Sequence, residues 1–403
     1  MTKKKHIPLL EMFLPFVGLL SQYTVGGFSV SLFFLLLIMI YRLLDGKMII
    51  RKICSKYYLF FGFVFFRDIV NLFVPCSVET MTQLNRMFEY TLFFSCVFFA
   101  IDSFDEYAFY KAWKVAGLIF GTGLLFHVVQ IYVFKQSIMP ISIIPGYVLR
   151  DVEMVAGNRP ASFFAEPASF VNSMLPLLFL SLRKREYKWA FLTSILIVLS
   201  TSTVGIVLAI FLWMAFIVFD EKSTRIKVMF VSMALFFLVI GFQIPFFEAS
   251  MQKLLLVLQG KSTFGSRVLI SLEVVGTMNP ISFLFGEAER DACHYVLTNS
   301  SSFSSGSQAV LYATEVGKVF LNTFGELIFR YGIVGLGLFL YTFKGKIFNQ
   351  KYGARIFAMM SLVSIFAQSA LLNPQYFLVT MILILFSITE RNEGTNNNME
   401  EKT

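Results

Sequence analysis

The chain has 403 residues, of which 57% are apolar and only 15% are charged. A soluble domain carries about 25% charged residues, so this composition excludes an ordinary soluble protein. The formal net charge of +9 would suggest nucleic-acid binding in a soluble chain. Here the Lys and Arg residues gather in short connectors between apolar runs, which is typical of cytoplasmic loops, and we expect no nucleic acid as a partner.

The apolar runs predict an all-α, polytopic membrane protein with about twelve transmembrane helices, since one crossing needs about 20 apolar residues. We expect the first span to be retained, because no small-residue cleavage site follows it. The long run 189–219 is divided into a hairpin near "STSTVG", which leaves the basic loops on both sides of it in the cytoplasm, together with both termini. The predicted spans are 7–22, 26–42, 57–75, 84–101, 112–134, 166–182, two within 189–219, 226–246, 323–343 and two within 355–389.

These spans divide the chain into four parts. Residues 1–246 hold the first nine spans and include an outer loop at 135–165. Residues 247–322 form one large extracytoplasmic loop, in which we expect short helices. Residues 323–389 hold the last three spans, and the polar tail 390–403 is expected to be disordered and cytoplasmic.

Two sets of charged residues within the predicted spans stand out, because an unpaired charge inside a membrane is costly. Arg67 and Asp68 are adjacent in the third span, whereas Glu326 and Arg330 lie four residues apart on one face of the tenth. Each set is either a structural ion pair or part of a functional site.

Four arginines fall at or near the outer rim of the membrane in this arrangement. The planar guanidinium group suits phosphate, so together they could hold a pyrophosphate group. Contact with anionic lipid headgroups is the alternative. These arginines are Arg159, Arg267, Arg290 and Arg330.

The residues that usually bind metals are few and scattered. The four cysteines show no C-x-x-C spacing, and the three histidines show no metal spacing, so we expect no metal site. His127 is expected to be a core residue. His294 in the large loop is a candidate general base, with an ordinary solvated histidine as the alternative.

Three segments together carry a family resemblance. Residues 159–167, "RPASFFAEP", resemble the R-x-x-G-x-F-x-E-P pattern of the Wzy-type O-antigen polymerases, except that Ser162 stands where the pattern has glycine. Residues 265–288 resemble a segment of that superfamily that ends at Leu-Phe-Gly. Residues 322–337 resemble the start of the span after the large outer loop, with Asn322, Gly332 and Gly335 in register.

The resemblance implies a glycosyltransferase in the bacterial plasma (inner) membrane, with its active site on the periplasmic or extracytoplasmic side. It would transfer a growing glycan from undecaprenyl pyrophosphate to a lipid-linked repeat unit, as for O-antigen or capsule. The partners implied are undecaprenyl-pyrophosphate-linked oligosaccharide, membrane lipid, a chain-length regulator and a flippase.

The roles implied for single residues follow from that chemistry, which needs no metal and no organic cofactor. The arginines would stabilise the pyrophosphate leaving group, and Asn322 would orient sugar hydroxyls. Glu166 is the first candidate for the catalytic base and His294 the second. Glu166 could instead serve only to orient Arg159.

Two other functions stay open. Ligases of the same superfamily transfer glycan to lipid A–core and typically carry a histidine where this chain has Leu321, which favours a polymerase. A flippase for lipid-linked oligosaccharide can also have twelve spans, but it should lack the large outer loop.

Overall fold

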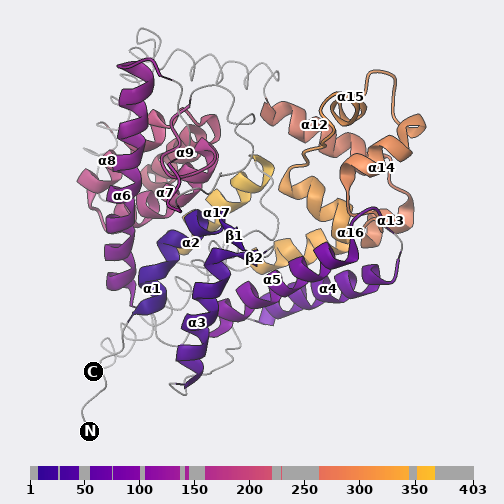
Figure 1. Cartoon of the computed structure of the whole chain (residues 1–403), viewed down its shortest axis with the longest axis horizontal. Coiled ribbons are helices and arrows are strands. Elements are labelled where there is room, and N and C mark those ends of the chain that lie inside the picture. The colour runs from indigo at the N-terminus through magenta and orange to yellow at the C-terminus, as the bar shows by residue number, and fades with distance from the viewer. Residues whose placement is uncertain are drawn as a thin grey trace. The chain divides into compact units, whose positions relative to one another are not determined.

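The computed structural model describes residues 8–25, 28–44, 55–74, 76–99, 105–136, 141–144, 159–219, 228, 263–344 and 352–367. Within these residues the chain is helical apart from two short strands, which confirms the all-α prediction (Figure 1). The parts of the prediction that lie outside them are nearly all of the ninth span, most of the last two spans, most of the outer loop 135–165, the start of the large loop and the polar tail.

The chain divides into two compact units, and each is made from two separate stretches of sequence. Unit 1 comprises Met1–Met48 and Phe99–Leu254, and unit 2 comprises Ile49–Phe98 and Leu255–Thr403. The first and third resemblance segments therefore belong to different units, whereas the second and third belong to the same unit.

Unit 1 contains the first part of the chain and the helices that follow residue 105. Its elements are α1 (Leu9–Phe13), η1 (Leu14–Phe16), α2 (Val17–Leu20), β1 (Thr24–Val25), β2 (Phe28–Ser29), α3 (Val30–Leu44), α6 (Glu106–Tyr132), α7 (Pro167–Arg183), α8 (Tyr187–Leu199) and α9 (Thr203–Phe219). The α6 helix begins at Asp105, whose carboxylate accepts hydrogen bonds from the Tyr107 and Ala108 amides. Helices α6, α7, α8 and α9 pack against one another. The predicted hairpin break falls at Ser200–Ser202, between α8 and α9, and these turn residues are buried.

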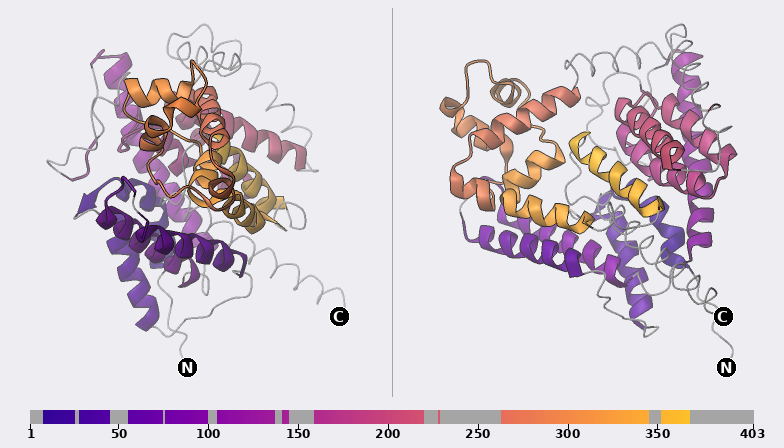
Figure 2. Two further views of the ribbon diagram at one scale, coloured as in Figure 1. Left: turned by 90° about the vertical axis from the view of Figure 1, so that its right-hand side faces the viewer. Right: turned by 180° about the vertical axis from the view of Figure 1, so that it is seen from behind.

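Unit 2 is organised around α16, which packs against α4, α12, α13 and α17 (Figures 1 and 2). Its elements are α4 (Ser55–Leu72), α5 (Thr80–Phe99), α12 (Thr263–Gly276), α13 (Pro280–Phe285), α14 (Ala292–Thr298), η5 (Ser300–Ser302), α15 (Gln308–Glu315), α16 (Thr323–Phe343) and α17 (Tyr352–Ala367). The short helices α13, α14 and α15 lie in the segment for which the sequence predicts a large loop with short helices.

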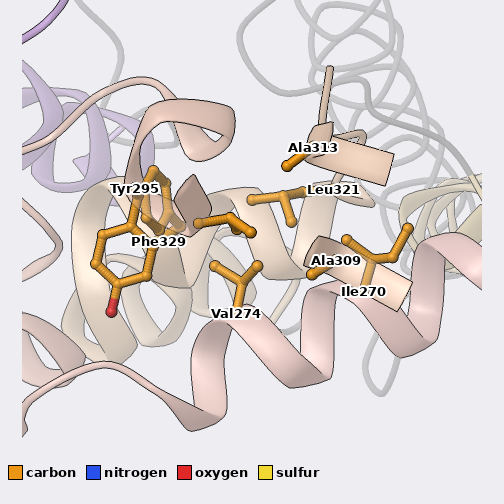
Figure 3. Packing of buried hydrophobic residues seen from close by; sticks show 8 residues of the cluster. Ile270, Val274, Tyr295, Ala309, Ala313, Leu321 and Phe329 are labelled. Atoms are coloured by element: carbon orange, nitrogen blue, oxygen red, sulfur yellow. The ribbon is translucent and has the colours of Figure 1, made fainter. Parts of the chain in front are cut away.

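A small hydrophobic core joins α14 and α15 to α12 and α16 (Figure 3). The Tyr295 ring of α14 meets the Phe329 ring of α16 edge-on, with 5.3 Å between their centroids. Aliphatic side chains fill the rest of the core: Ile270, Val274, Ala309, Ala313 and Leu321. Because this core holds α14 and α15 against α16, the polar residues near α14 have a fixed framework.

Two of the described helices are long and apolar enough to cross a membrane, namely Glu106–Tyr132 and Thr323–Phe343. The second coincides with the predicted tenth span. Shorter apolar helices cover Leu9–Leu20, Val30–Tyr41, Tyr187–Leu199 and Thr203–Val218. The described residues thus contain two candidate membrane spans, fewer than the twelve predicted crossings.

Candidate functional site

The end of α13 meets a break in α16 through two glycines. Gly332 has φ 69° and ψ −177° inside α16, and Gly286 at the end of α13 has φ 94°. A Cβ atom on Gly332 would lie 2.1 Å from the Leu284 carbonyl oxygen, and one on Gly286 would lie 2.3 Å from the Arg330 carbonyl oxygen. Both positions therefore require glycine. The second and third resemblance segments thus meet backbone to backbone.

Arg67 of α4 holds the end of α13 in this position. Its Nε donates to the Phe285 carbonyl at 2.8 Å, and its Nη2 donates to the Gly286 carbonyl at 2.9 Å. A further guanidinium nitrogen donates to the Asn71 side chain. The last carbonyls of a helix lack partners within that helix, so the guanidinium of Arg67 satisfies them. Arg67 thus has a structural role, and in the described residues it forms no ion pair with its neighbour Asp68.

Asp68 instead pairs with Arg290, which follows α13. The Arg290 Nη2 lies 2.5 Å from the Asp68 carboxylate, and its Nη1 donates to the Arg330 carbonyl at 3.2 Å. The guanidinium also lies over the Tyr331 ring, 5.2 Å from the centroid. With a side chain only 6% exposed, Arg290 ties the segment after α13 to both α4 and α16.

Arg330 is more accessible than Arg290 at this junction. Its Nη2 lies 3.1 Å from Glu326 one turn earlier in α16, and the Arg330 side chain is 20% exposed. It lies within electrostatic range of Tyr90 and Asp68. We refer to these charged residues of unit 2 as the buried charge cluster: Arg67, Asp68, Arg290, Glu326 and Arg330.

An apolar groove between α4 and α5 reaches this cluster. The groove has a volume of about 290 Å³ and is lined mainly by aromatic and aliphatic side chains. Asp68 and Tyr90 also line the groove. Asp68 belongs to the buried charge cluster, and Tyr90 interacts electrostatically with Arg330.

A second cavity, of about 300 Å³, is polar and lies beside α14. His294 is 53% exposed, and its Nδ1 lies 3.0 Å from a Glu289 carboxylate oxygen. The Glu289 carboxylate also accepts from the Ser77 amide and hydroxyl and from the Asp291 amide. Burial alone would raise the pKa of Glu289, but the hydrogen bonds from Ser77 and Asp291 and the nearby His294 lower it below the ordinary value. Glu289 is therefore held as a carboxylate facing His294.

The remaining predicted residues of unit 2 lie on α12 and at the start of α16. Arg267 lies over the Phe320 ring, 5.8 Å from the centroid. Asn322 is 2% exposed and caps α16, because its side-chain oxygen accepts from the Gly325 amide at 2.8 Å. Ser271 joins α12 to the start of α16. Its hydroxyl donates to the Arg267 carbonyl and accepts from the Asn322 amide.

The first resemblance segment forms a tight turn into α7 in unit 1. Ser162, which stands at the glycine position of the pattern, has φ 59°, and its buried hydroxyl donates to the Phe120 carbonyl at 2.7 Å. Glycine adopts this left-handed backbone conformation without strain, which explains why the pattern has glycine at this position. The buried Phe164 ring packs edge-on against Phe120, with 5.1 Å between centroids. Pro167 is the first residue of α7, where its missing amide hydrogen is harmless.

Glu166 immediately precedes α7, and its side chain is exposed. Arg159 is half-buried. Among the described residues, the side chains of Arg159 and Glu166 form no ion pair with each other. His127 is buried, as expected, and its Nδ1 accepts a hydrogen bond from the Ala161 amide at 3.4 Å.

Unit 2 brings Arg290, Arg330, Asn322 and His294 onto one framework, whereas Arg159 and Glu166 belong to unit 1. Sequence reasoning missed Glu289, Tyr331 and the role of Arg67. The charged run 287–291, directly after Gly286 in an otherwise apolar chain, is the signal that could have revealed Glu289.

Cys76 and Cys293 are free thiols. In the described ranges, no three His, Cys, Asp or Glu side chains lie close enough to share a metal ion.

No family model, no curated protein and no solved structure matches this chain.

Proposed function

We propose that this chain is a membrane glycosyltransferase that polymerises polysaccharide repeat units on the outer face of a bacterial plasma membrane. It would transfer a growing glycan from undecaprenyl pyrophosphate to the terminal sugar of a lipid-linked repeat unit. The proposal includes the twelve-span arrangement with both termini in the cytoplasm.

The observation that carries the proposal is the contact between the second and third resemblance segments. Gly286 and Gly332 are both pattern positions, and each packs on a backbone carbonyl of the other segment. Their meeting sets Arg290 and Arg330 beside the break in α16. A helix break that exposes backbone groups beside charged side chains is typical of functional sites in membrane proteins.

Arg330 is the residue that we assign to the pyrophosphate. Its guanidinium carries five N–H donors, and in the described residues its one ion-pair partner is Glu326. Glu326 would hold Arg330 in place before substrate binds, and the remaining donors would face the phosphate oxygens. When the bond from the anomeric carbon to the pyrophosphate breaks, negative charge grows on the leaving oxygen, and a preorganised guanidinium stabilises that charge.

The apolar groove between α4 and α5 suits the lipid part of such a donor. Its lining is apolar, and it reaches Asp68 and Tyr90 near Arg330. An isoprenoid chain in the groove would bring the attached pyrophosphate to the buried charge cluster. Arg290 is fully engaged by Asp68, Arg330 and Tyr331, so we assign it to holding the site together rather than to the phosphate.

Arg159 and Arg267 remain proposed pyrophosphate ligands, and Glu166 remains a proposed alternative base. The other role expected for Glu166, as an ion-pair partner of Arg159, is not supported, because the two side chains form no ion pair in the described residues. Asn322 keeps its proposed contact with sugar hydroxyls, and its side-chain oxygen also caps α16.

Deleting the gene and separating the cell-surface polysaccharide on a gel tests the function. A polymerase deletion removes the ladder but leaves lipid capped with a single repeat unit. Loss of every capped species would indicate a ligase or a flippase and would reject the proposal.

A set of charge variants tests the assignment of Arg330. R330Q should abolish the ladder, and K318Q, which removes an exposed cation from the same unit, should leave it intact. If Arg330 serves only to neutralise Glu326, the double variant E326Q/R330Q will recover the ladder. If Arg330 binds the donor, the double variant will stay inactive while the protein is still present in the membrane at normal levels.

A further inference from the structure

The polar cavity beside α14 has the features of a saccharide site. Its volume of about 300 Å³ is at the lower end of the range for ligand pockets, roughly 300–1,000 Å³. Its lining is polar and includes Thr277, Asn279, Glu287, Glu289, His294 and Asn299. Hydroxyl, amide and carboxylate groups of this kind are the partners that sugar hydroxyls bind. Glu287 accepts a hydrogen bond from the Ala288 amide with one carboxylate oxygen. Its other carboxylate oxygen could accept a hydrogen bond from a sugar hydroxyl.

The cavity is connected directly to the donor side of the proposed enzyme. The Glu287 amide donates to the Phe329 carbonyl at 2.6 Å, and Phe329 immediately precedes Arg330 in α16. A sugar in the cavity and a phosphate at Arg330 would therefore lie on two sides of one short backbone contact.

His294 and Glu289 form an oriented pair at the cavity. Glu289 is fixed by three hydrogen bonds from Ser77 and Asp291, and it faces the His294 Nδ1 at 3.0 Å. When Nδ1 donates to this carboxylate, the neutral imidazole leaves Nε2 unprotonated. That is the arrangement of a base whose orientation is set by a neighbouring carboxylate.

We propose that this cavity binds the acceptor sugar and that the His294 Nε2 takes the proton from its attacking hydroxyl, with Glu289 as the positioning residue. This rests on the proposed polymerase function. The acceptor oxygen forms a bond to the anomeric carbon of the donor glycan. The bond from that carbon to the pyrophosphate breaks, its electron pair leaves with the pyrophosphate oxygen, and the hydroxyl proton passes to His294.

Other titratable side chains lie at the cavity or near it. Glu287 and Tyr295 also line the cavity. Asp291 caps α14 through the Cys293 amide, and Glu273 of α12 binds the start of α15 through Ser307 and the Ala309 amide. Among the described residues, Glu289 is the one carboxylate in ion-pair contact with His294.

The test uses the purified full-length protein in lipid nanodiscs. The donor is the host's lipid-linked repeat unit, and the acceptor is the free repeat-unit oligosaccharide with a fluorescent label. H294N should slow acceptor extension at least ~100-fold, the usual size of a lost general base. E289Q should slow it about tenfold, because the imidazole then loses the carboxylate that orients it. E289D should recover part of the rate.

D291N is the matched control. It makes the same carboxylate-to-amide change two residues from Glu289, and asparagine caps a helix as well as aspartate does, so its rate should stay within about twofold of wild type. An E289Q rate within about twofold of wild type, or an H294N rate within about threefold of wild type, would overturn the assignment.

A binding measurement separates this proposal from the polymerase function. The free oligosaccharide should slow amide hydrogen exchange across residues 277–299 in wild type and less so in a Glu287→Ala variant. Wild type that extends no acceptor refutes the polymerase function. Wild type that extends acceptor while residues 277–299 gain no protection refutes only the cavity assignment.

Discussion

Replacing Gly332 by alanine tests the contact on which the site geometry depends. The backbone at Gly332, with φ 69° and ψ −177°, lies in a region that is essentially restricted to glycine and costs other residues about 1–3 kcal/mol. The new Cβ would also lie 2.1 Å from the Leu284 carbonyl oxygen. That neighbour is backbone, which cannot move aside by changing a rotamer, so we expect a loss of at least ~3 kcal/mol.

Gly337 in the same helix is the matched control. Gly337 has no atom within 4 Å of its would-be Cβ, so G337A should gain about 0.5–1 kcal/mol from helix propensity. The two variants differ by one methyl group each and should shift stability in opposite directions.

Thermal unfolding of the purified protein in detergent measures this difference. A change of 1 kcal/mol moves the Tm of a 150–250-residue unit by about 2–4 °C, so G332A should melt at least ~6 °C below G337A. The double variant G286A/G332A should cost less than the sum of the two single variants, because both break the same contact. Equal Tm values for G332A and G337A would refute the argument from backbone packing.

Three further predictions concern other parts of the site. S162G relieves a left-handed backbone conformation but loses the hydrogen bond to the Phe120 carbonyl, so its free energy of unfolding should stay within about 1 kcal/mol of wild type. S162V keeps the left-handed conformation and also loses the hydrogen bond, so it should lose at least ~2 kcal/mol in the same denaturation assay. The pKa of Glu289 is lowered on folding, so its charge stabilises the protein above the unfolded pKa of about 4.3, and the stability gap between wild type and E289Q should close as the pH falls below that value. N322S should keep the cap of α16 and N322A should lose about 1 kcal/mol; a ladder lost in N322S at unchanged stability would indicate that Asn322 contacts sugar.

The helices were largely predictable because each is a local pattern. The tenth span was predicted at 323–343, and α16 covers Thr323–Phe343. The hairpin break near "STSTVG" was also correct, since α8 ends at Leu199 and α9 begins at Thr203. Charge distribution in the loops and turn-forming residues carry this information within a few positions.

The partners of the charged residues were not predictable, because they depend on distant parts of the chain. Arg67 and Asp68 are adjacent in sequence, yet neighbours in a helix point to different faces. Asp68 pairs with Arg290, which is 222 positions away, and Arg67 binds the carbonyls that end α13. Glu289 was missed for the same reason, since its anchor is Ser77 on the connection between α4 and α5.

The two arginines beside the broken helix differ in a way that separates a structural role from a binding role. Arg290 contacts a carboxylate, a carbonyl and an aromatic ring, and only 6% of its side chain is exposed. An anion could reach it only by displacing contacts that join three segments. Arg330 has one carboxylate partner, one helical turn away, and it is 20% exposed. A phosphate can share the Arg330 guanidinium without breaking the fold, because Glu326 and Arg330 already belong to the same helix. The buried pair of Asp68 and Arg290 therefore fixes the position of α16, and the more exposed pair of Glu326 and Arg330 is the one that we propose offers its charge to a substrate.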